Sequence, residues 1–295
     1  VPGIECEMHT NGWPKHNGVF EGAAAVFIFC DGGGRHPAIR PERVKILNDL
    51  VKKGAGIACA HYGVEVPAGD TGKTMQDWIG GYYEHRFSVN PMWAPDFKTF
   101  PKHPITRGVK PFKITDEWYF NMRFRKDGVG KITPILSAKP GKDVRDGPYV
   151  YPRGPYKHII DAEGRAETMM WAYERPNGSR GFGFTGGHKH MNWGNELRVD
   201  DRKPDTPVVA TEFVGTSISS AGDGQDKIKD HDKLLSNNPC IKFHNRQRGY
   251  VRCTLTPETW TSDFMVVDKV TKPGGKVTKR TSMVIESGNP KLKKA

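Results

Sequence analysis

Two apolar stretches decide the fold class: Ala23 to Cys30 (AAAVFIFC) and Gly56 to His61 (GIACAH). Each is a continuous run without polar alternation, which is typical of a strand buried on both faces of a parallel sheet. Between them, Pro41 opens an amphipathic pattern that ends before Gly54, as expected for a helix with a proline start and a glycine stop. Strand, helix and strand in this order predict a βαβ unit of an α/β sheet with the two strands adjacent.

Functional groups in such sheets gather at the carboxyl ends of the strands, which here are Asp31–Arg35 and His61–Glu65. His61 leaves its strand directly into a turn, the arrangement of a nucleophile elbow that presents one side chain above the sheet. Cys59 lies two residues earlier inside the strand and is expected to point away, so a Cys-dependent amidotransferase is not expected. An imidazole at the crest suits a general base or a metal ligand. A hydrogen-bonded structural histidine is the alternative.

The bulk composition favours a globular protein. The 295 residues carry a formal charge of +12, but the Lys and Arg residues are scattered, so we interpret them as a basic solvated surface and expect no nucleic-acid partner. No run is long enough to span a bilayer, so no membrane association is expected. The five cysteines show no metal or redox spacing; as free thiols they favour a reducing, cytoplasmic location. The sequence does not indicate the oligomeric state.

Six sequence blocks resemble a known family in the order that the family shows. They are FIFCDGGGRHP (Phe27 to Pro37), GIACAHYGVEVP (Gly56 to Pro67), DWIGGYYEHRFSVNP (Asp77 to Pro91), KHPITRGVKPF (Lys102 to Phe112), DEWYFNMRF (Asp116 to Phe124) and GFGFTGGHKHMNWGN (Gly181 to Asn195). The family is the ThuA-like (trehalose-utilisation) group of the class I glutamine amidotransferase-like fold. The resemblance implies a flavodoxin-like parallel sheet and a link to the metabolism of trehalose and other glycosides.

Compared with that family, a first strand and helix are missing, so we expect an N-terminally incomplete sheet with a gap in its middle. Composition changes after Leu197, which predicts an α/β domain over residues 1–198, a linker over 199–206 and a small β-rich C-terminal appendage over 207–295. In the appendage, Pro207 to Ile218 and Asn245 to Cys253 resemble the C-terminal end of PhoD-type alkaline phosphatases. We expect it to form short strands and loops and to add no group to the His61 site.

Two kinds of site are compatible with the residues at the strand ends. A metal-free site would use His61 as the base, with Glu117 or Glu65 orienting it. The alternative holds one divalent metal such as zinc with His61, His85 and His188 and an open position for water. Glycine N–H groups bind anions or sugar hydroxyls, and aromatic rings stack on sugars, although a tight turn and core packing are the alternatives. On this basis, the expected substrate-binding residues are Gly33, Trp118, Tyr119, His188 and Trp193.

The sequence therefore predicts an enzyme-like domain that acts on a small-molecule carbohydrate or glycoside, of trehalose type or a keto-sugar derivative. Its chemistry would be hydrolytic or acid–base chemistry at His61. One alternative is a non-catalytic sugar-binding or regulatory module with the same cleft. A PhoD-type alkaline phosphatase or phosphodiesterase is the other alternative, and it is disfavoured because the metal motifs of that class are absent from the sequence.

Overall fold

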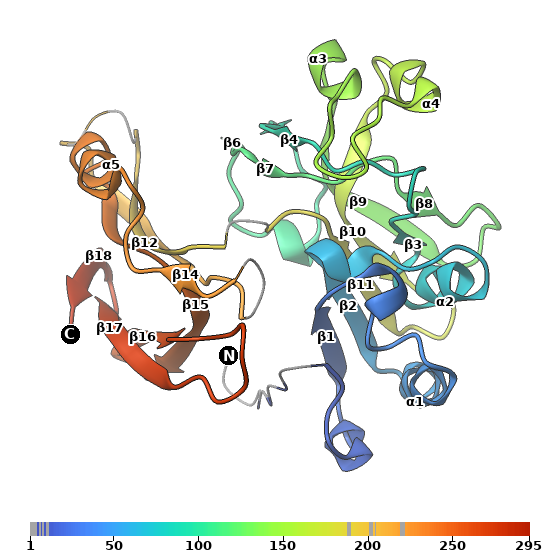
Figure 1. The fold of residues 1–295 in the computed structure, drawn as a ribbon, viewed down its shortest axis with the longest axis horizontal. Helices are drawn as coiled ribbons and strands as arrows, with labels where there is room; N and C mark the ends of the chain where they lie inside the picture. Colours follow the sequence, from blue (N-terminus) through green and yellow to red (C-terminus); the bar gives the residue numbers. More distant parts are fainter. Residues whose placement is uncertain are drawn as a thin grey trace. The chain divides into compact units, whose positions relative to one another are not determined.

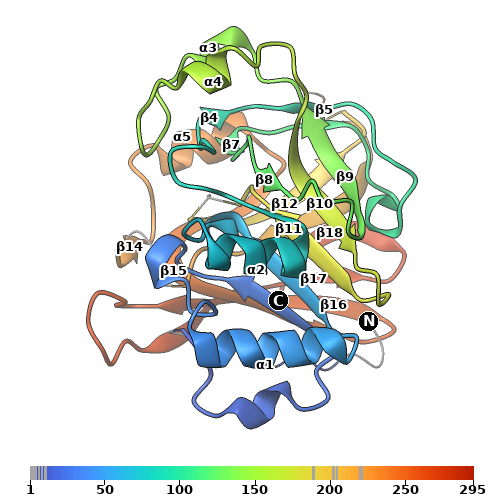
Figure 2. The same ribbon diagram turned by 90° about the vertical axis from the view of Figure 1, so that its right-hand side faces the viewer.

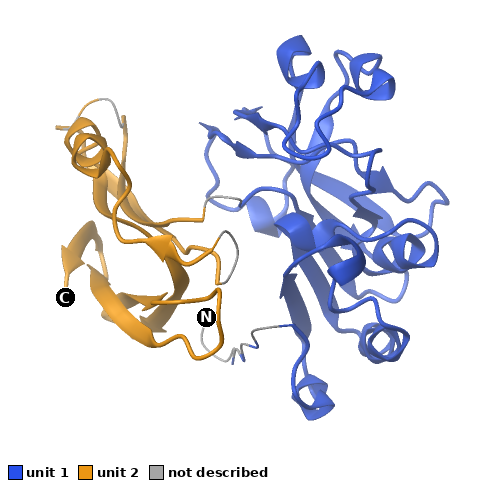
Figure 3. Cartoon of the chain, viewed as in Figure 1, with its two compact units in different colours: residues 1–188 blue, residues 189–295 orange. Residues whose placement is uncertain are grey.

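The computed structural model describes residues 5, 7, 9, 12–187, 190–200, 203, 205–218 and 222–295. The chain divides into two compact units, residues 1–188 and residues 189–295 (Figure 3). Each unit has a sheet of its own. No helix within the described ranges combines the length and the apolar character needed to cross a membrane.

Unit 1 is built on a five-stranded sheet with the order β1-β2-β11-β10-β9 (Figure 1). The strands are β1 (Ala25–Phe29), β2 (Gly56–Ala60), β9 (Lys131–Ala138), β10 (Glu167–Glu174) and β11 (Arg180–Phe184). β1, β2 and β11 run parallel, whereas β10 and β9 are antiparallel to their neighbours. The prediction that the two apolar runs form adjacent parallel strands is confirmed, but the sheet as a whole is mixed.

Helices α1 (Pro41–Lys52) and α2 (Asp70–Ile79) cover one face of this sheet (Figures 1 and 2). α1 starts with proline at its first position, and α2 ends at Gly80 in the left-handed conformation that terminates helices. Gly183 of β11 lets the Trp171 ring lie directly on the strand, because a Cβ at this position would come within 2.0 Å of that ring. The core under the helices includes Ile57, Cys59, Met75, Trp78 and Trp171.

The other face of β1 is open. Phe27 and Phe29 alternate with the helix-facing Ile28 and are 64% and 49% exposed. The prediction that this strand is buried on both faces is therefore wrong, because α1 and α2 supply apolar side chains to one side only. The expected gap in the sheet is also absent: β1 pairs with β2 from Ala25↔Gly56 to Phe29↔Ala60 and forms the edge of the sheet.

The remaining elements of unit 1 are short. The antiparallel pairs β3–β8, β4–β7 and β5–β6 lie outside the main sheet, and a second apolar cluster around Trp93, Phe97, Trp118 and Phe120 packs beneath them. The strands are β3 (Gly81–Tyr82), β4 (Met92–Trp93), β5 (Asp96–Phe97), β6 (Phe112–Lys113), β7 (Asp116–Glu117) and β8 (Arg123–Phe124); the helices are α3 (Lys142–Arg145), α4 (Lys157–Ile160) and the 3-10 helices η1 (Asn17–Phe20), η2 (Gly33–Arg35), η3 (His61–Val64) and η4 (Pro104–Thr106).

Unit 2 is one seven-stranded antiparallel sheet with the order β13-β12-β15-β16-β17-β18, in which β14 also pairs with β15. Its elements are β12 (Asn192–Arg198), β13 (Val208–Val214), β14 (Gly224–Gln225), α5 (His231–Asn237), β15 (Ile241–Leu255), β16 (Thr259–Val267), β17 (Val277–Glu286) and β18 (Asn289–Lys294). The sheet curls back on itself, since the Leu292 N–H donates to Glu196 Oε1 (3.1 Å) and Thr211 Oγ1 donates to the Pro290 carbonyl (2.7 Å).

The C-terminal part is β-rich, in line with the prediction, but its strands are longer than expected. β15 has 15 residues, and its first part pairs with β12 while its last part pairs with β16. β12 belongs to this sheet, although composition placed residues up to 198 in the first domain. The sequence block Gly181 to Asn195, which resembles the ThuA-like family, therefore runs across the boundary between the two units.

Candidate functional site

His61 lies at the point where β2 ends and η3 begins, with a backbone φ of +48°. A residue with a Cβ rarely adopts this left-handed backbone conformation, and holding it costs on the order of 1–3 kcal/mol. Such strain persists where the surrounding structure fixes the backbone. A strained backbone of this kind is also the geometry of a residue presented at a strand-to-helix elbow. The position predicted from the sequence is therefore also a conformationally unusual one.

Among the described residues, Thr185 and Tyr119 hydrogen-bond to the His61 ring. Nδ1 lies 3.2 Å from the carbonyl oxygen of Thr185, which can only accept, so Nδ1 carries the proton and donates. In this neutral tautomer Nε2 accepts from the Tyr119 hydroxyl at 3.2 Å, and the two rings pack with centroids 4.8 Å apart. Thr185 Oγ1 in turn donates to the Tyr119 carbonyl (3.0 Å). Burial raises the pKa of the Tyr119 phenol well above its usual range, so this phenol stays protonated at neutral pH.

Glu65 follows η3 and lies beside the same elbow. Its backbone carbonyl accepts from the Gly33 N–H (2.9 Å), which joins the two predicted strand ends. Burial raises the pKa of its carboxyl to about 7, so both the acid and the carboxylate are populated near neutral pH. A Cβ at Gly33, whose φ is +61°, would lie 3.6 Å from Glu65 Oε1 and 3.7 Å from the Tyr62 hydroxyl, so Gly33 borders the carboxyl group.

Glu117 comes to the site from β7 and is buried. The side-chain amide of Asn90 donates to Glu117 Oε1 at 2.7 Å. Burial raises the pKa values of the Tyr119 and Tyr83 phenols, and the nearby charges of Glu117 and Glu65 add to this effect. The two predicted carboxylates therefore surround one pair of tyrosines, of which Tyr119 is bonded to His61.

A further histidine, His36, hydrogen-bonds to the turn that carries His61. The buried His36 accepts from the Ala38 N–H at Nδ1 (3.2 Å) and donates from Nε2 to the Gly63 carbonyl (3.0 Å). Burial lowers its pKa to about 4, so it stays neutral in this position. His36 thus positions the turn that carries His61, a role that its place in the sequence did not indicate.

Other predicted site residues lie elsewhere. Trp118 is buried in the second apolar cluster, where its ring packs against Phe97 and Phe184 and Nε1 donates to the Ile114 carbonyl (3.2 Å). Trp193 belongs to β12 of unit 2 and packs against His244 there, with ring centroids 4.3 Å apart. These surroundings favour packing roles for both tryptophans.

The predicted metal site is not assembled among the described residues. His85 is exposed, and its ring faces that of Tyr151 at a centroid distance of 6.0 Å. His188, the third predicted ligand, lies outside the residues that the structure describes. Within the described ranges, no three His, Cys, Asp or Glu side chains come close enough to hold a metal ion.

Cys59 packs in the core under the helices, two residues before the crest, as the alternation of the strand predicts. Burial, with a smaller contribution from Cys30, raises the pKa of its thiol above the usual range. A protonated, buried thiol does not act as a nucleophile. The titratable groups that the elbow presents are therefore imidazole, phenol and carboxyl groups.

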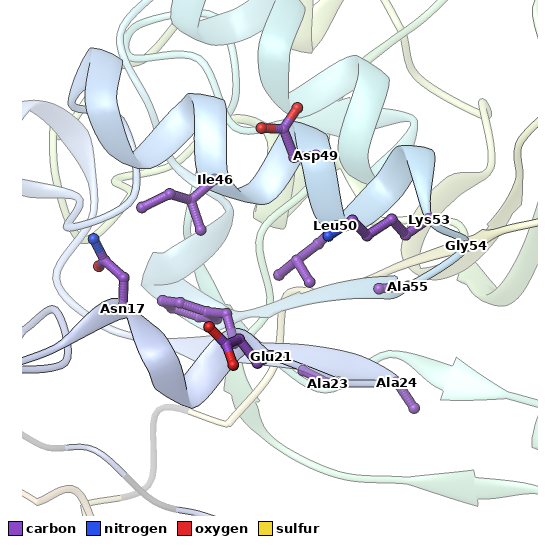
Figure 4. Close-up of a pocket in the computed structure, with 12 residues that line it drawn as sticks. Asn17, Glu21, Ala23, Ala24, Ile46, Asp49, Leu50, Lys53, Gly54 and Ala55 are labelled. Atoms are coloured by element: carbon purple, nitrogen blue, oxygen red, sulfur yellow. The ribbon is translucent and has the colours of Figure 1, made fainter.

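An open hollow of about 530 Å³ lies between the segment that leads into β1 and the C-terminal part of α1 (Figure 4). Asn17, Glu21, Ile46, Asp49 and Lys53 are among its lining residues. It contains none of the predicted site residues. The titratable groups at the carboxyl ends of the strands therefore remain the stronger candidate site.

The fold and these groups define an α/β domain with a histidine at the crest of a strand-to-helix elbow. The chain belongs to the trehalose utilisation (ThuA) family, whose model matches residues 22–199. A second family model, of PhoD-like phosphatases, matches residues 161–264. The recognition of a ThuA-like part followed by a PhoD-like part is thus confirmed.

The PhoD-like part has a curated relative. Alkaline phosphatase D of Bacillus subtilis (strain 168) is 44% identical over 108 residues, which are 37% of this chain and 18% of that protein. A solved structure described as the structure of PhoD is also 44% identical, with 36% of this chain and 20% of that chain covered and a TM-score of 0.35. The chain therefore spans about a fifth of the length of these relatives.

Proposed function

We propose that unit 1 is a carbohydrate-active enzyme that performs acid–base chemistry on a glycoside or keto-sugar derivative with Glu65, Tyr119 and His61. The family membership supports a carbohydrate substrate. The β1–α1–β2 unit, with β11 parallel on the other side of β2, supports the flavodoxin-like ancestry that the family implies. The observation that carries the reaction type is a carboxyl with a pKa of about 7 beside a strained elbow histidine.

Glu65 is the group that gives or takes the proton, because a general acid or base works best when its pKa is near the operating pH. As an acid it donates to the oxygen of a departing glycoside. As a carboxylate it accepts a proton from water, or from a carbon next to a keto group. The Tyr119 hydroxyl donates its proton to His61 Nε2, so its oxygen is left to accept a hydrogen bond from a substrate hydroxyl.

Thr185 positions His61 and Tyr119, and Glu117 lies close to Tyr119 in the sequence. Asn90 fixes one oxygen of Glu117, and Thr185 fixes both the tautomer of His61 and the backbone of Tyr119. These groups need no contact with the substrate to perform this role. Their hydrogen bonds hold the reactive groups in one geometry before the substrate arrives. Such preorganised groups stabilise the transition state without having to rearrange during the reaction.

The test compares turnover of methyl 3-keto-glucoside, methyl glucoside and trehalose, with and without a chelator. Glu65→Gln is expected to lower kcat/KM on the order of 10²–10⁴-fold, as for loss of a general acid or base. The exposed Glu21→Gln serves as the matched control and retains full activity. Sugar binding without turnover would instead support a non-catalytic module, and phosphate release from p-nitrophenyl phosphate would support the phosphatase alternative.

A further inference from the structure

The Tyr83 side chain shares one side of the elbow with Glu65. The Tyr83 N–H donates to the Val64 carbonyl (2.9 Å), and Tyr83 pairs with Glu65 in a parallel bridge. Side chains of bridged residues project from the same side of the pair. The phenol therefore extends along the carboxyl whose role in proton transfer is proposed above.

The Tyr83 hydroxyl is buried without a hydrogen bond. The residue is 1% exposed, and its hydroxyl oxygen has no hydrogen-bond partner within the described part of the chain. Its ring is fixed by an edge contact with Tyr119 at 5.2 Å. Other buried tyrosines bond their hydroxyls: Tyr82 to Glu84 (2.8 Å), Tyr149 to the Arg145 carbonyl (2.5 Å) and Tyr173 to the Val129 carbonyl (3.1 Å). An unsatisfied buried hydroxyl lowers stability, so a ligand group that bonds to it would recover this free energy.

The surroundings of this hydroxyl define what that ligand is. Burial is the main cause that raises the pKa of this phenol, and the neighbouring groups that add to it are the carboxyls of Glu65 and Glu117 and the phenols of Tyr156 and Tyr62. Such an acidic, oxygen-rich environment repels a phosphate and favours a neutral molecule with hydroxyls that donate and accept.

We infer that the Tyr83 hydroxyl and the Glu65 carboxyl form a subsite that binds one hydroxyl of a neutral, unphosphorylated sugar. This inference rests on the proposed function of the same site. The Tyr83 O–H donates to the sugar oxygen, and the sugar O–H donates to Glu65. Tyr83 is a binding residue in this scheme, and the carboxylates around it disfavour phosphate esters.

The experiment uses the full chain, with trehalose, methyl glucoside and trehalose 6-phosphate as probes in calorimetric titration. Tyr83→Phe is expected to weaken trehalose binding about tenfold, which corresponds to about 1.4 kcal/mol. Without sugar, the same variant should melt at the same or a higher temperature, because it removes an unsatisfied hydroxyl. Tyr82→Phe is the neighbouring control: it loses the bond to Glu84, so it should melt lower and keep its affinity for trehalose.

Each outcome has a defined meaning. If trehalose binds the wild type and Tyr83→Phe equally well, the subsite is refuted while the proposed function stands. If Tyr83→Phe melts clearly below the wild type without sugar, the hydroxyl is satisfied in the free protein and the inference is refuted. Tighter binding of trehalose 6-phosphate than of trehalose would overturn the preference for neutral sugars. If the wild type binds neither trehalose nor methyl glucoside, the proposed function falls together with the inference.

Discussion

Replacing Glu65 by Gln should make the protein more stable at alkaline pH while it removes activity. The folded state holds the Glu65 carboxyl with a pKa of about 7, raised by burial, whereas an exposed glutamate has the ordinary value of 4.5. Between these two pH values the unfolded chain releases the proton while the folded protein retains it. Stability therefore falls as pH rises through this window, and the loss is complete above pH 7.

The size of the effect follows from the shift. At about 1.36 kcal/mol per pKa unit, the difference amounts to about 3 kcal/mol for a fully buried group. Glu65 is only partly buried, so solvent screening reduces the expected effect to roughly 2 kcal/mol. For a unit of this size, that corresponds to a rise in Tm of about 4–8 °C for Glu65→Gln at pH 8, and to little change at pH 4.5.

Thermal denaturation of the wild type and variant at both pH values measures this difference. The transition of unit 1 can be followed by near-UV circular dichroism, since five of the seven tryptophans lie in residues 1–188. Glu21→Gln, which changes an exposed glutamate, should shift Tm by the same small amount at both pH values. The reasoning is refuted if the Tm difference between wild type and Glu65→Gln does not grow from pH 4.5 to pH 8.

Two further predictions concern the elbow and the core beside it. His61→Gly should be more stable than His61→Ala by about 1 kcal/mol, because glycine adopts a φ of +48° without strain; both variants should lose activity, and equal denaturation midpoints for the two would contradict the strained geometry. Gly183→Ala should lower the free energy of unfolding by at least about 1–3 kcal/mol, since its methyl group would lie 2.0 Å from the Trp171 ring; a variant as stable as the wild type in urea would show that the ring does not lie on the strand.

Part of the site could be predicted because it depends on residues that are adjacent in the sequence. The apolar run of β2 followed by His61 and Gly63 indicates a strand that stops at a turn, and the structure places the strained residue at that position. Glu65 follows on the same turn. Short-range patterns of this kind depend on a few adjacent residues, so they can be recognised without knowledge of distant contacts.

The remaining groups could not be predicted because they depend on partners far away in the chain. Tyr83 resembles any other tyrosine in a short strand, and only its contacts with Glu65 and Tyr119 show that its hydroxyl is unusual. Trp118 illustrates the reverse case: its sequence block suggests a sugar platform, but Phe97 and Phe184 enclose it. Phe27 and Phe29 likewise read as buried, since the sequence does not tell how many faces of a sheet the helices cover.

The length of β15 has a consequence for how unit 2 opens. Its residues Ile241–Asn245 bond to β12, and Arg248–Leu255 bond to β16, so a single strand is shared by both parts of the sheet. Releasing β15 breaks both sets of bonds together and separates the β12–β13 pair from the β16–β17–β18 strands. The amide hydrogens along β15 should therefore exchange with solvent only when unit 2 unfolds cooperatively, which makes this strand the slowest-exchanging segment of the C-terminal half.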